Sequence, residues 1–319
     1  MNASVTKVTL SLCLLSAFFL NSLQAQQTSF EFDYFGQVPP DTAVIEFRLP
    51  DQVRNGFDFI NSLSFAPSGK SIICGLTDRE WSTSTIVFST CRNRVWTALD
   101  TLPYCRSGIN SNPVFLNDSV VYFSSRFNKE LEQTSDFDIF TTTLSDRGWT
   151  LPEKVKDLSE DTCREFIGTF SLSGDVYFTR LENLGQPVSD LPLNNELYCG
   201  EYANGRFRSV RNMGIPINTV YGEFCAYADP HGSFLLFGSN RPGGYGKVDT
   251  YISFHSGDGT WSAPVNLGSR INTAEIDSDA VITPDGKYMF FIRRQGWNCE
   301  VPNRIYWVST AILDKFKPE

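Results

Sequence analysis

The sequence has few of the residues on which many enzymes and metal sites depend, and these shortages exclude several classes of function. It contains only two histidines, His231 and His255, so a metal site built from several histidines is excluded. No Gly-x-Ser-x-Gly segment is present, so a serine hydrolase of the nucleophile-elbow type is not expected. No two cysteines have Cys-x-x-Cys spacing, which argues against a zinc ribbon and against a thioredoxin-like site.

Positive charge is scarce as well. The chain has 27 lysines and arginines against 36 aspartates and glutamates, and its formal net charge is −9. Proteins bind nucleic acids and anionic membranes through clustered positive charge, so we expect neither partner. No apolar run after the amino terminus is long enough to cross a bilayer. We therefore expect no membrane insertion, and we expect a monomer.

The amino terminus has the pattern of a targeting segment. Lys7 precedes an apolar stretch over residues 8–20, and Ala25 places a small residue at the expected cleavage position. This pattern predicts a secretory signal peptide over residues 1–25 and a periplasmic or secreted protein. Export makes disulfides possible. Cys74 and Cys91 fall on neighbouring predicted strands and are the candidate pair, the alternative being that most cysteines are buried small apolar side chains.

A strand–turn–strand motif recurs along the chain and is its most informative feature. The clearest copy covers residues 280–291, where Pro284-Asp285-Gly286 separates two apolar runs. The turns of the five copies are 49 to 58 residues apart. They centre on Pro67, Leu116, Leu172, Pro230 and Pro284. A period near fifty, carried by strands rather than helices, predicts a β-propeller.

Each repeat continues with a third strand and then an aromatic residue that opens a fourth, outer strand. These aromatic residues are Trp96, Trp149, Phe207 and Trp261. The pattern predicts an all-β fold, a five-bladed β-propeller of four-stranded blades, as a single domain over residues 26–319. The fifth repeat lacks a fourth strand, and residues 43–47 form an apolar strand that belongs to no repeat. We predict that this N-terminal strand completes the last blade and so removes two exposed sheet edges.

The repeats resemble a known family. The segment Phe237-Gly238-Ser239-Asn240-Arg241-Pro242-Gly243, with Trp261-Ser262-Ala263-Pro264 after it, is similar to the WD-like repeat of TolB-type propellers. It resembles the exported versions common in Bacteroidetes-like bacteria, and the resemblance covers residues 34–313. The second and third repeats depart from it, because they lack the proline of the turn. The resemblance implies a propeller scaffold used mostly for binding.

Paired charges recur between the second and third strands of the repeats. An arginine follows the second strand, and an acidic residue begins the third. The pairs are Arg126 with Asp138, Arg180 with Glu196 and Arg241 with Asp249. One such pair could clamp a ligand, but three equivalent pairs favour a repeated salt bridge that fixes each blade's loop, because guanidinium holds a carboxylate at two points. In the fifth repeat the arginine that follows the second strand is Arg294.

Polar residues also recur at one register near the start of the first strands. They are Asn110, Glu165, Glu223 and Asp277, with Asp279 two residues further on. First strands line the channel of a propeller, so these residues could converge at one channel mouth. They could coordinate Ca²⁺, which takes six to eight oxygens. They could also be glycosidase carboxylates, since arabinanase-like five-bladed propellers use acids in such a place. The alternative to both is that they cap strand starts by binding backbone N–H groups.

Aromatic residues outside the repeat's structural positions are the remaining candidates. Trp81, Tyr245 and Trp297 lie in the predicted loops between second and third strands, where they could stack on sugars or anchor a protein partner. We predict a binding scaffold for a protein or glycan partner, without catalysis and without a required cofactor. The alternative is a carbohydrate-active hydrolase that uses Glu165, Glu223 and Asp277. Phe166 and Phe224 would argue against that alternative if they filled the channel.

Overall fold

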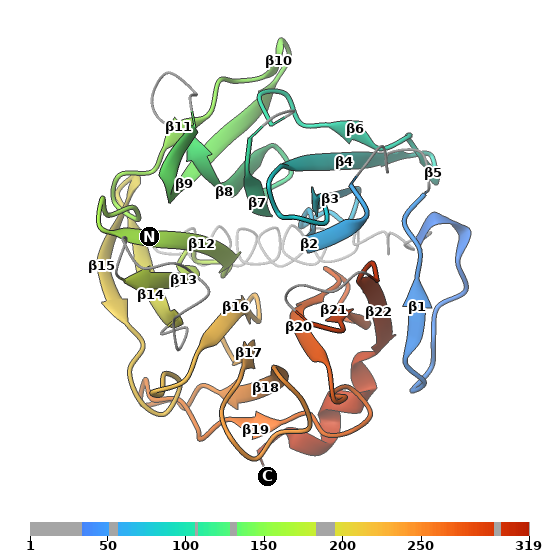
Figure 1. The fold of residues 1–319 in the computed structure, drawn as a ribbon, viewed down its shortest axis with the longest axis vertical. Helices are drawn as coiled ribbons and strands as arrows, with labels where there is room; N and C mark the ends of the chain where they lie inside the picture. Colours follow the sequence, from blue (N-terminus) through green and yellow to red (C-terminus); the bar gives the residue numbers. More distant parts are fainter. Residues whose placement is uncertain are drawn as a thin grey trace, which may run out of the picture. The chain divides into compact units, whose positions relative to one another are not determined.

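The chain forms a ring of five antiparallel sheets, as the computed structural model shows (Figure 1). The structure describes residues 34–50, 57–105, 108–127, 133–182, 195–296 and 301–318. The predicted signal peptide and Trp297 lie outside these residues. Within them, no helix has the length and apolar character needed to cross a membrane. The five sheets confirm the predicted five-bladed propeller.

Each blade is one sheet, and its strands follow one another from the axis outward. Blade 1 contains β2 (Phe59–Phe65), β3 (Ser71–Thr77), β4 (Ser84–Arg92), β5 (Val95–Trp96) and β6 (Asp100–Thr101). Blade 2 contains β7 (Asn110–Asn117), β8 (Val120–Phe127), β9 (Gln133–Ser145), β10 (Gly148–Trp149) and β11 (Glu153–Lys154). Blade 3 contains β12 (Cys163–Phe170), β13 (Val176–Glu182), β14 (Asn195–Ala203) and β15 (Arg206–Asn212). In blades 1 and 2 the outer edge is divided into two short strands that both pair with the third strand.

The last two blades follow the same plan. Blade 4 contains β16 (Glu223–Ala228), β17 (Phe234–Ser239), β18 (Asp249–Phe254) and β19 (Val265–Asn266). Blade 5 contains β20 (Ile276–Ile282), β21 (Tyr288–Arg294), β22 (Arg304–Ser309) and, as its outer strand, β1 (Ile45–Phe47). Two 3-10 helices flank the ring, η1 (Tyr34–Gly36) near the beginning and η4 (Thr310–Phe316) after β22.

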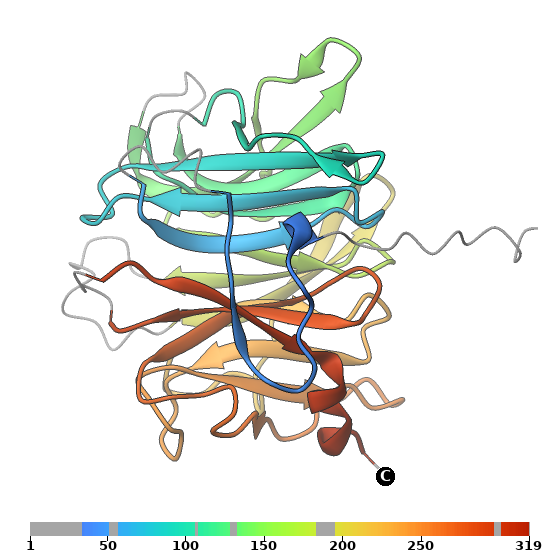
Figure 2. The same cartoon turned by 90° about the vertical axis from the view of Figure 1, so that its right-hand side faces the viewer.

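The two ends of the chain close the ring at blade 5, as the sequence predicts. Strand β1 pairs antiparallel with β22, with Ile45 opposite Trp307 and Phe47 opposite Ile305. Figure 2 shows this N-terminal strand running beside the C-terminal strands. The Phe47 ring lies 5.4 Å from that of Trp307, and the Tyr34 ring lies 5.1 Å from it. Aromatic packing of this kind anchors the amino-terminal segment to the last blade.

The five inner strands all bend at the same place. Each carries a register shift of the kind a β-bulge produces, and three of the bulged residues, Asn112, Cys225 and Asp279, have φ of 50°, 52° and 57°. In blade 3 the bulged residue is Gly168, where an added Cβ would lie 2.5 Å from the carbonyl oxygen of Ala226. Bulges bend a strand and re-aim its side chains. Here they bring the five inner strands together around a cavity of only about 30 Å³, which is room for a water molecule.

The hydrophobic core is divided among the spaces between blades. Ile73 and Ile86 of blade 1, for example, pack in one cluster with Val121, Phe123 and Phe140 of blade 2. This is the arrangement expected when both faces of every sheet are covered by its neighbours.

The predicted disulfide between Cys74 and Cys91 is wrong. Both side chains are buried. Cys74 lies opposite Val87 on β4, whereas Cys91 lies four residues further along that strand and faces Trp96. Two cysteines so far apart along a ladder cannot be joined, so they serve as buried apolar side chains.

Candidate functional site

Three acidic residues begin the inner strands of blades 3, 4 and 5, and each is paired with an arginine. Glu165, Glu223 and Asp277 all have an exposed fraction of 0%. Glu165 lies 3.1 Å from Arg180, and Glu223 lies 3.1 Å from Arg241. Asp277 makes the same contact with Arg293 of blade 5. Each acid therefore belongs to its own blade's ion pair.

The arginines are fixed from two further sides. Each guanidinium lies over a tyrosine of the third strand, at 4.8 Å for Tyr198, 5.0 Å for Tyr251 and 4.5 Å for Tyr306. Each also donates a hydrogen bond to a backbone carbonyl of the loop that enters the blade. Cation–π and charge-assisted contacts of this kind favour arginine over lysine. The arginines thus fix the strand starts.

The predicted pairs of Arg180 with Glu196 and of Arg241 with Asp249 are wrong in their partners. Glu196 accepts a hydrogen bond from Asn212 at 2.7 Å, and Asp249 accepts one from Asn266 at 2.8 Å. Both asparagines come from the fourth strand. In blade 2 the ion pair of Asp138 is with Lys154, at 2.8 Å. Arg180 and Arg241 contact the first strand instead. Glu165 is buried there while Glu196 is not, and Asp249, although buried, already accepts hydrogen bonds from Asn266 and from the backbone N–H groups of Tyr245 and Gly246.

Two of the three buried acids accept hydrogen bonds on both carboxylate oxygens. Glu223 accepts hydrogen bonds from the backbone N–H and the hydroxyl of Thr219, from Ser239 and from Arg241. Asp277 accepts the same two bonds from Thr273, in addition to Arg293. Neither carboxylate therefore has an oxygen without a donor.

Glu165 is the exception, and one substitution between repeats explains it. The residue that corresponds to Thr219 and Thr273 is Glu160, which still donates its N–H to Glu165 at 3.2 Å but has no hydroxyl to offer. Its carboxylate binds Arg180 instead, at 2.6 Å. As a result, Oε2 of Glu165 is buried and accepts no hydrogen bond from the residues that the structure describes. A buried acceptor without a donor is costly, and protonation or a ligand hydroxyl would relieve that cost.

Electrostatics near Glu165 favour its protonated form. Burial raises the pKa of Glu165 to about 8, Arg180 opposes that rise, and the nearby Asp136 and Asp138 add to it. Burial, with Asp138 beside it, also raises the pKa of Asp136 to about 6. Since Glu160 already supplies a negative charge to Arg180, Glu165 can carry a proton at neutral pH. We call Glu165 and Asp136 the acid pair.

The acid pair predicts a pH dependence of stability. Between pH 4.5, the ordinary pKa of a glutamate, and about 8 the folded chain keeps a proton on Glu165 that the unfolded chain has lost. The folded state then binds more protons, so stability falls as pH rises through this window. We expect the melting temperature to decline from pH 5 to pH 8. Glu160→Thr, which restores the hydroxyl found in blades 4 and 5, is expected to flatten the decline, and an unchanged slope would contradict the assignment.

The other predicted site residues divide between framework and channel. Asn110 accepts a hydrogen bond from Ser125 at 2.9 Å and is fully buried in blade 2. Asp279 lines the small axial cavity and pairs with Arg294 at 2.8 Å. Among the residues that the structure describes, no three His, Cys, Asp or Glu side chains are grouped so as to hold a metal ion. The acids considered for Ca²⁺ are each bound by an arginine instead.

The aromatic candidates have different surroundings. The Trp81 ring lies 5.6 Å from the guanidinium of Arg294, whereas Tyr245 is 54% exposed. Phe224 packs between blades 4 and 5 with Val248 and Ile276. Phe166 lies beside Phe137, with the two ring centres 4.8 Å apart. These two phenylalanines therefore lie in contacts between blades.

Three residues of the site escape the sequence analysis. Arg293, not Arg294, is the blade 5 counterpart of Arg180 and Arg241. The sequence alone does not show which of two adjacent arginines faces the acid, because that depends on the strand pairing. Glu160 stands where blades 4 and 5 have the uncharged Thr219 and Thr273, so the repeat does not mark it. Asp136 could have been found, since it precedes Asp138 by two residues, and alternate residues of a strand share a face.

Comparisons with known proteins bear on the fold. No protein-family model and no curated protein matches the chain. An α-L-arabinofuranosidase from Podospora anserina is similar in structure, with a TM-score of 0.50 and 13% identity over 85% of this chain and 98% of that one. An α-L-arabinanase from Penicillium chrysogenum has a TM-score of 0.45 and 12% identity over 76% of this chain and 72% of that one. At these identities the likeness shows a shared fold.

These comparisons correct the predicted function. The prediction of a scaffold without catalysis is wrong, because a solved structure that shares this fold at a TM-score of 0.50 is that of an enzyme, an α-L-arabinofuranosidase. A puromycin-hydrolysing peptidase from Mycobacterium tuberculosis matches over only 36% of its length, with a TM-score of 0.42 and 10% identity over 76% of this chain.

Proposed function

We propose that the protein hydrolyses glycosidic bonds, with Glu165 as the proton donor and Asp136 as the second carboxyl group. The observation that carries this proposal is that Oε2 of Glu165 accepts no hydrogen bond from the described residues. In its counterparts, Glu223 and Asp277, both carboxylate oxygens accept hydrogen bonds. A carboxyl group that keeps its proton beside a second carboxylate is the arrangement on which glycoside hydrolysis depends.

The acid pair would divide the reaction between its members. Glu165 gives its proton to the glycosidic oxygen as the bond from that oxygen to the anomeric carbon breaks. Asp136 accepts a proton from a water molecule whose oxygen forms the new bond to that carbon. The products are an alcohol and a hemiacetal, and solvent returns a proton to Glu165 and takes one from Asp136. Arg180, held by Glu160 and Tyr198, positions Glu165.

Other residues singled out from the sequence are candidates for contact with sugars. Asp279 and Trp81, joined through Arg294, and the exposed Tyr245 are proposed sugar contacts, since aromatic faces stack on sugar rings. Glu223 and Asp277 are not proposed as catalytic groups. The α-L-arabinofuranosidase of Podospora anserina makes arabinofuranosides the first substrates to test.

A substrate panel tests the proposal. Purified protein is incubated with arabinan, arabinoxylan, xylan and aryl α-L-arabinofuranosides across pH 5 to 8, and released sugar is measured by chromatography. Release by the wild type, with release from the polysaccharides lowered at least about 10²-fold in Glu165→Gln, is the expected result. No release from any glycoside by correctly folded protein would overturn the proposal.

We also propose an exported protein that meets its glycan outside the cytoplasm, acts as a monomer and binds no nucleic acid. The signal-peptide pattern over residues 1–25 and the acidic net charge of −9 support these proposals. Membership among TolB-type propellers rests on the repeat resemblance alone and stays a prediction. Mass determination of the exported chain, with cleavage after Ala25 expected, tests the first of them.

A further inference from the structure

A groove lies between blades 4 and 5 beneath η4, away from the acid pair. Its volume is about 450 Å³, within the range of about 300–1,000 Å³ typical of ligand sites. The buried side chains of Ile252 and Leu313 form part of its lining. We call it the C-terminal groove, because η4 supplies one wall.

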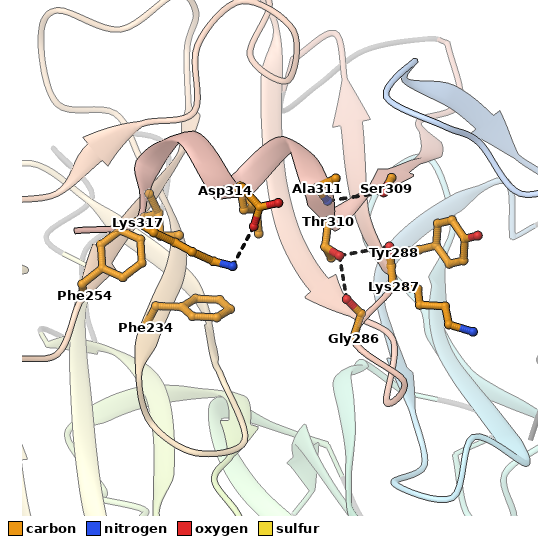
Figure 3. Close-up of a pocket in the computed structure, with 12 residues that line it drawn as sticks. Phe234, Phe254, Gly286, Lys287, Tyr288, Ser309, Thr310, Ala311, Asp314 and Lys317 are labelled. Atoms are coloured by element: carbon orange, nitrogen blue, oxygen red, sulfur yellow. Dashed lines mark hydrogen bonds and ion pairs between the residues drawn. The ribbon is translucent and has the colours of Figure 1, made fainter. Parts of the chain in front are cut away.

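Two phenylalanine rings form the opposite wall. Phe234 and Phe254 are half-buried, and their ring centres are 6.3 Å apart at an angle of 56°. Figure 3 shows both rings beside the open space, with the Lys317 side chain extending toward them. The rings pack against the core of blades 4 and 5, and both remain partly exposed where they line the groove.

Polar groups line the rest of the groove in the manner of a sugar site. Lys317 and Asp314 form an ion pair of 2.6 Å whose side chains are 65% and 63% exposed, so a ligand hydroxyl can share it at little cost. The Thr310 hydroxyl donates to the Gly286 carbonyl at 2.6 Å and keeps lone pairs for a donor.

The charges of the groove decide between ligands. Lys317 is balanced by Asp314, and Lys287 lies 3.5 Å from Asp285. Each of these lysines therefore has a carboxylate partner, and paired donors and acceptors beside ring faces match a neutral polyhydroxy ligand. We propose that the C-terminal groove is a second glycan-binding site that holds a neutral oligosaccharide segment against Phe234 and Phe254. The proposal rests on the glycan-directed function proposed above.

Binding measurements with matched variants test this site. Isothermal titration with arabino- and xylo-oligosaccharides would compare the wild type with Phe254→Leu, which keeps apolar contact with the core but removes the ring. We expect dissociation constants to rise about tenfold. The control is Tyr202→Ala, which removes a ring that is 41% exposed on blade 3 and is expected to leave binding unchanged.

The outcomes separate this inference from the proposed function. Cleavage of a small aryl glycoside should be the same for wild type and Phe254→Leu, because such a substrate does not reach the groove. Equal oligosaccharide affinity in the two proteins, or no binding by the wild type, would overturn the groove proposal. Weakened binding in Phe254→Leu without cleavage of any glycoside by the wild type would support the groove and overturn the hydrolase.

Discussion

Replacing Glu165 with glutamine is expected to lower kcat for glycoside cleavage by about 10²- to 10⁴-fold, the usual contribution of a general acid. Glutamine has the same shape and can still accept the N–H of Glu160, but it has no proton to give. Substrate affinity should change little, because the lost interaction belongs to the transition state. Steady-state kinetics on an activated and an unactivated substrate measure the effect, which is smaller when the leaving group needs no proton.

Blade 4 supplies the matched control for this variant. Glu223→Gln makes the same chemical change at the equivalent place, where the carboxylate accepts hydrogen bonds from Thr219, Ser239 and Arg241. We expect it to lower stability, by about 3–5 kcal/mol at most, because it leaves Arg241, whose side chain is only 14% exposed, without its anion. Folded Glu223→Gln should keep near-wild-type kcat. Equal losses of kcat in both variants would show that Glu165 acts only through the fold.

Deleting residues 34–50 is expected to unfold the protein. The segment carries three buried apolar side chains, Tyr34, Phe47 and Leu49, with exposed fractions of 4%, 3% and 6%. Burial of each contributes about 1.5–3 kcal/mol, which together approaches the total stability of about 5–15 kcal/mol of an ordinary domain. The deletion also leaves β22 as an open edge that can pair with other chains. Circular dichroism and light scattering would record lost structure and aggregation.

A milder change at the same strand serves as its control. Glu46→Gln removes the ion pairs with Arg304 and Arg48, whose side chains are 53% and 78% exposed, and exposed pairs contribute about 0–1 kcal/mol each. Its melting temperature should stay within a few degrees of the wild type. A deletion variant that melts like the wild type would contradict the idea that the termini close the ring.

The repeat made most of the fold predictable. Strand–turn–strand spacing, together with a fifth repeat that lacks its outer strand, predicts the blade count and the pairing of β1 with β22, because sheet edges need partners. Charge partners are harder to predict. Arg180 has an acid opposite it on both neighbouring strands, Glu165 and Glu196, and only the burial of each decides between them.

The acid pair marks the limit of reasoning from one sequence. The register of the inner strands identifies Glu165, Glu223 and Asp277 as equivalent, and they are equivalent in position. They differ in chemistry because Glu160 stands where Thr219 and Thr273 stand in the next blades. That difference is visible in the sequence only once the loops are aligned by their contacts. The C-terminal groove joins β17, β18 and η4, which no local pattern connects.

The most direct test of the acid pair is the pH profile of kcat/KM for an arabinofuranoside or whichever glycoside the panel identifies. We predict a bell-shaped profile. Activity rises as Asp136 ionises near its raised pKa of about 6, and it falls as Glu165 loses its proton near its raised pKa of about 8. Glu160→Thr should move the upper limb to lower pH, because the restored hydroxyl stabilises the ionised form of Glu165. An upper limb that stays in place in this variant, or cleavage that persists in Glu165→Gln with the same profile, would contradict this prediction.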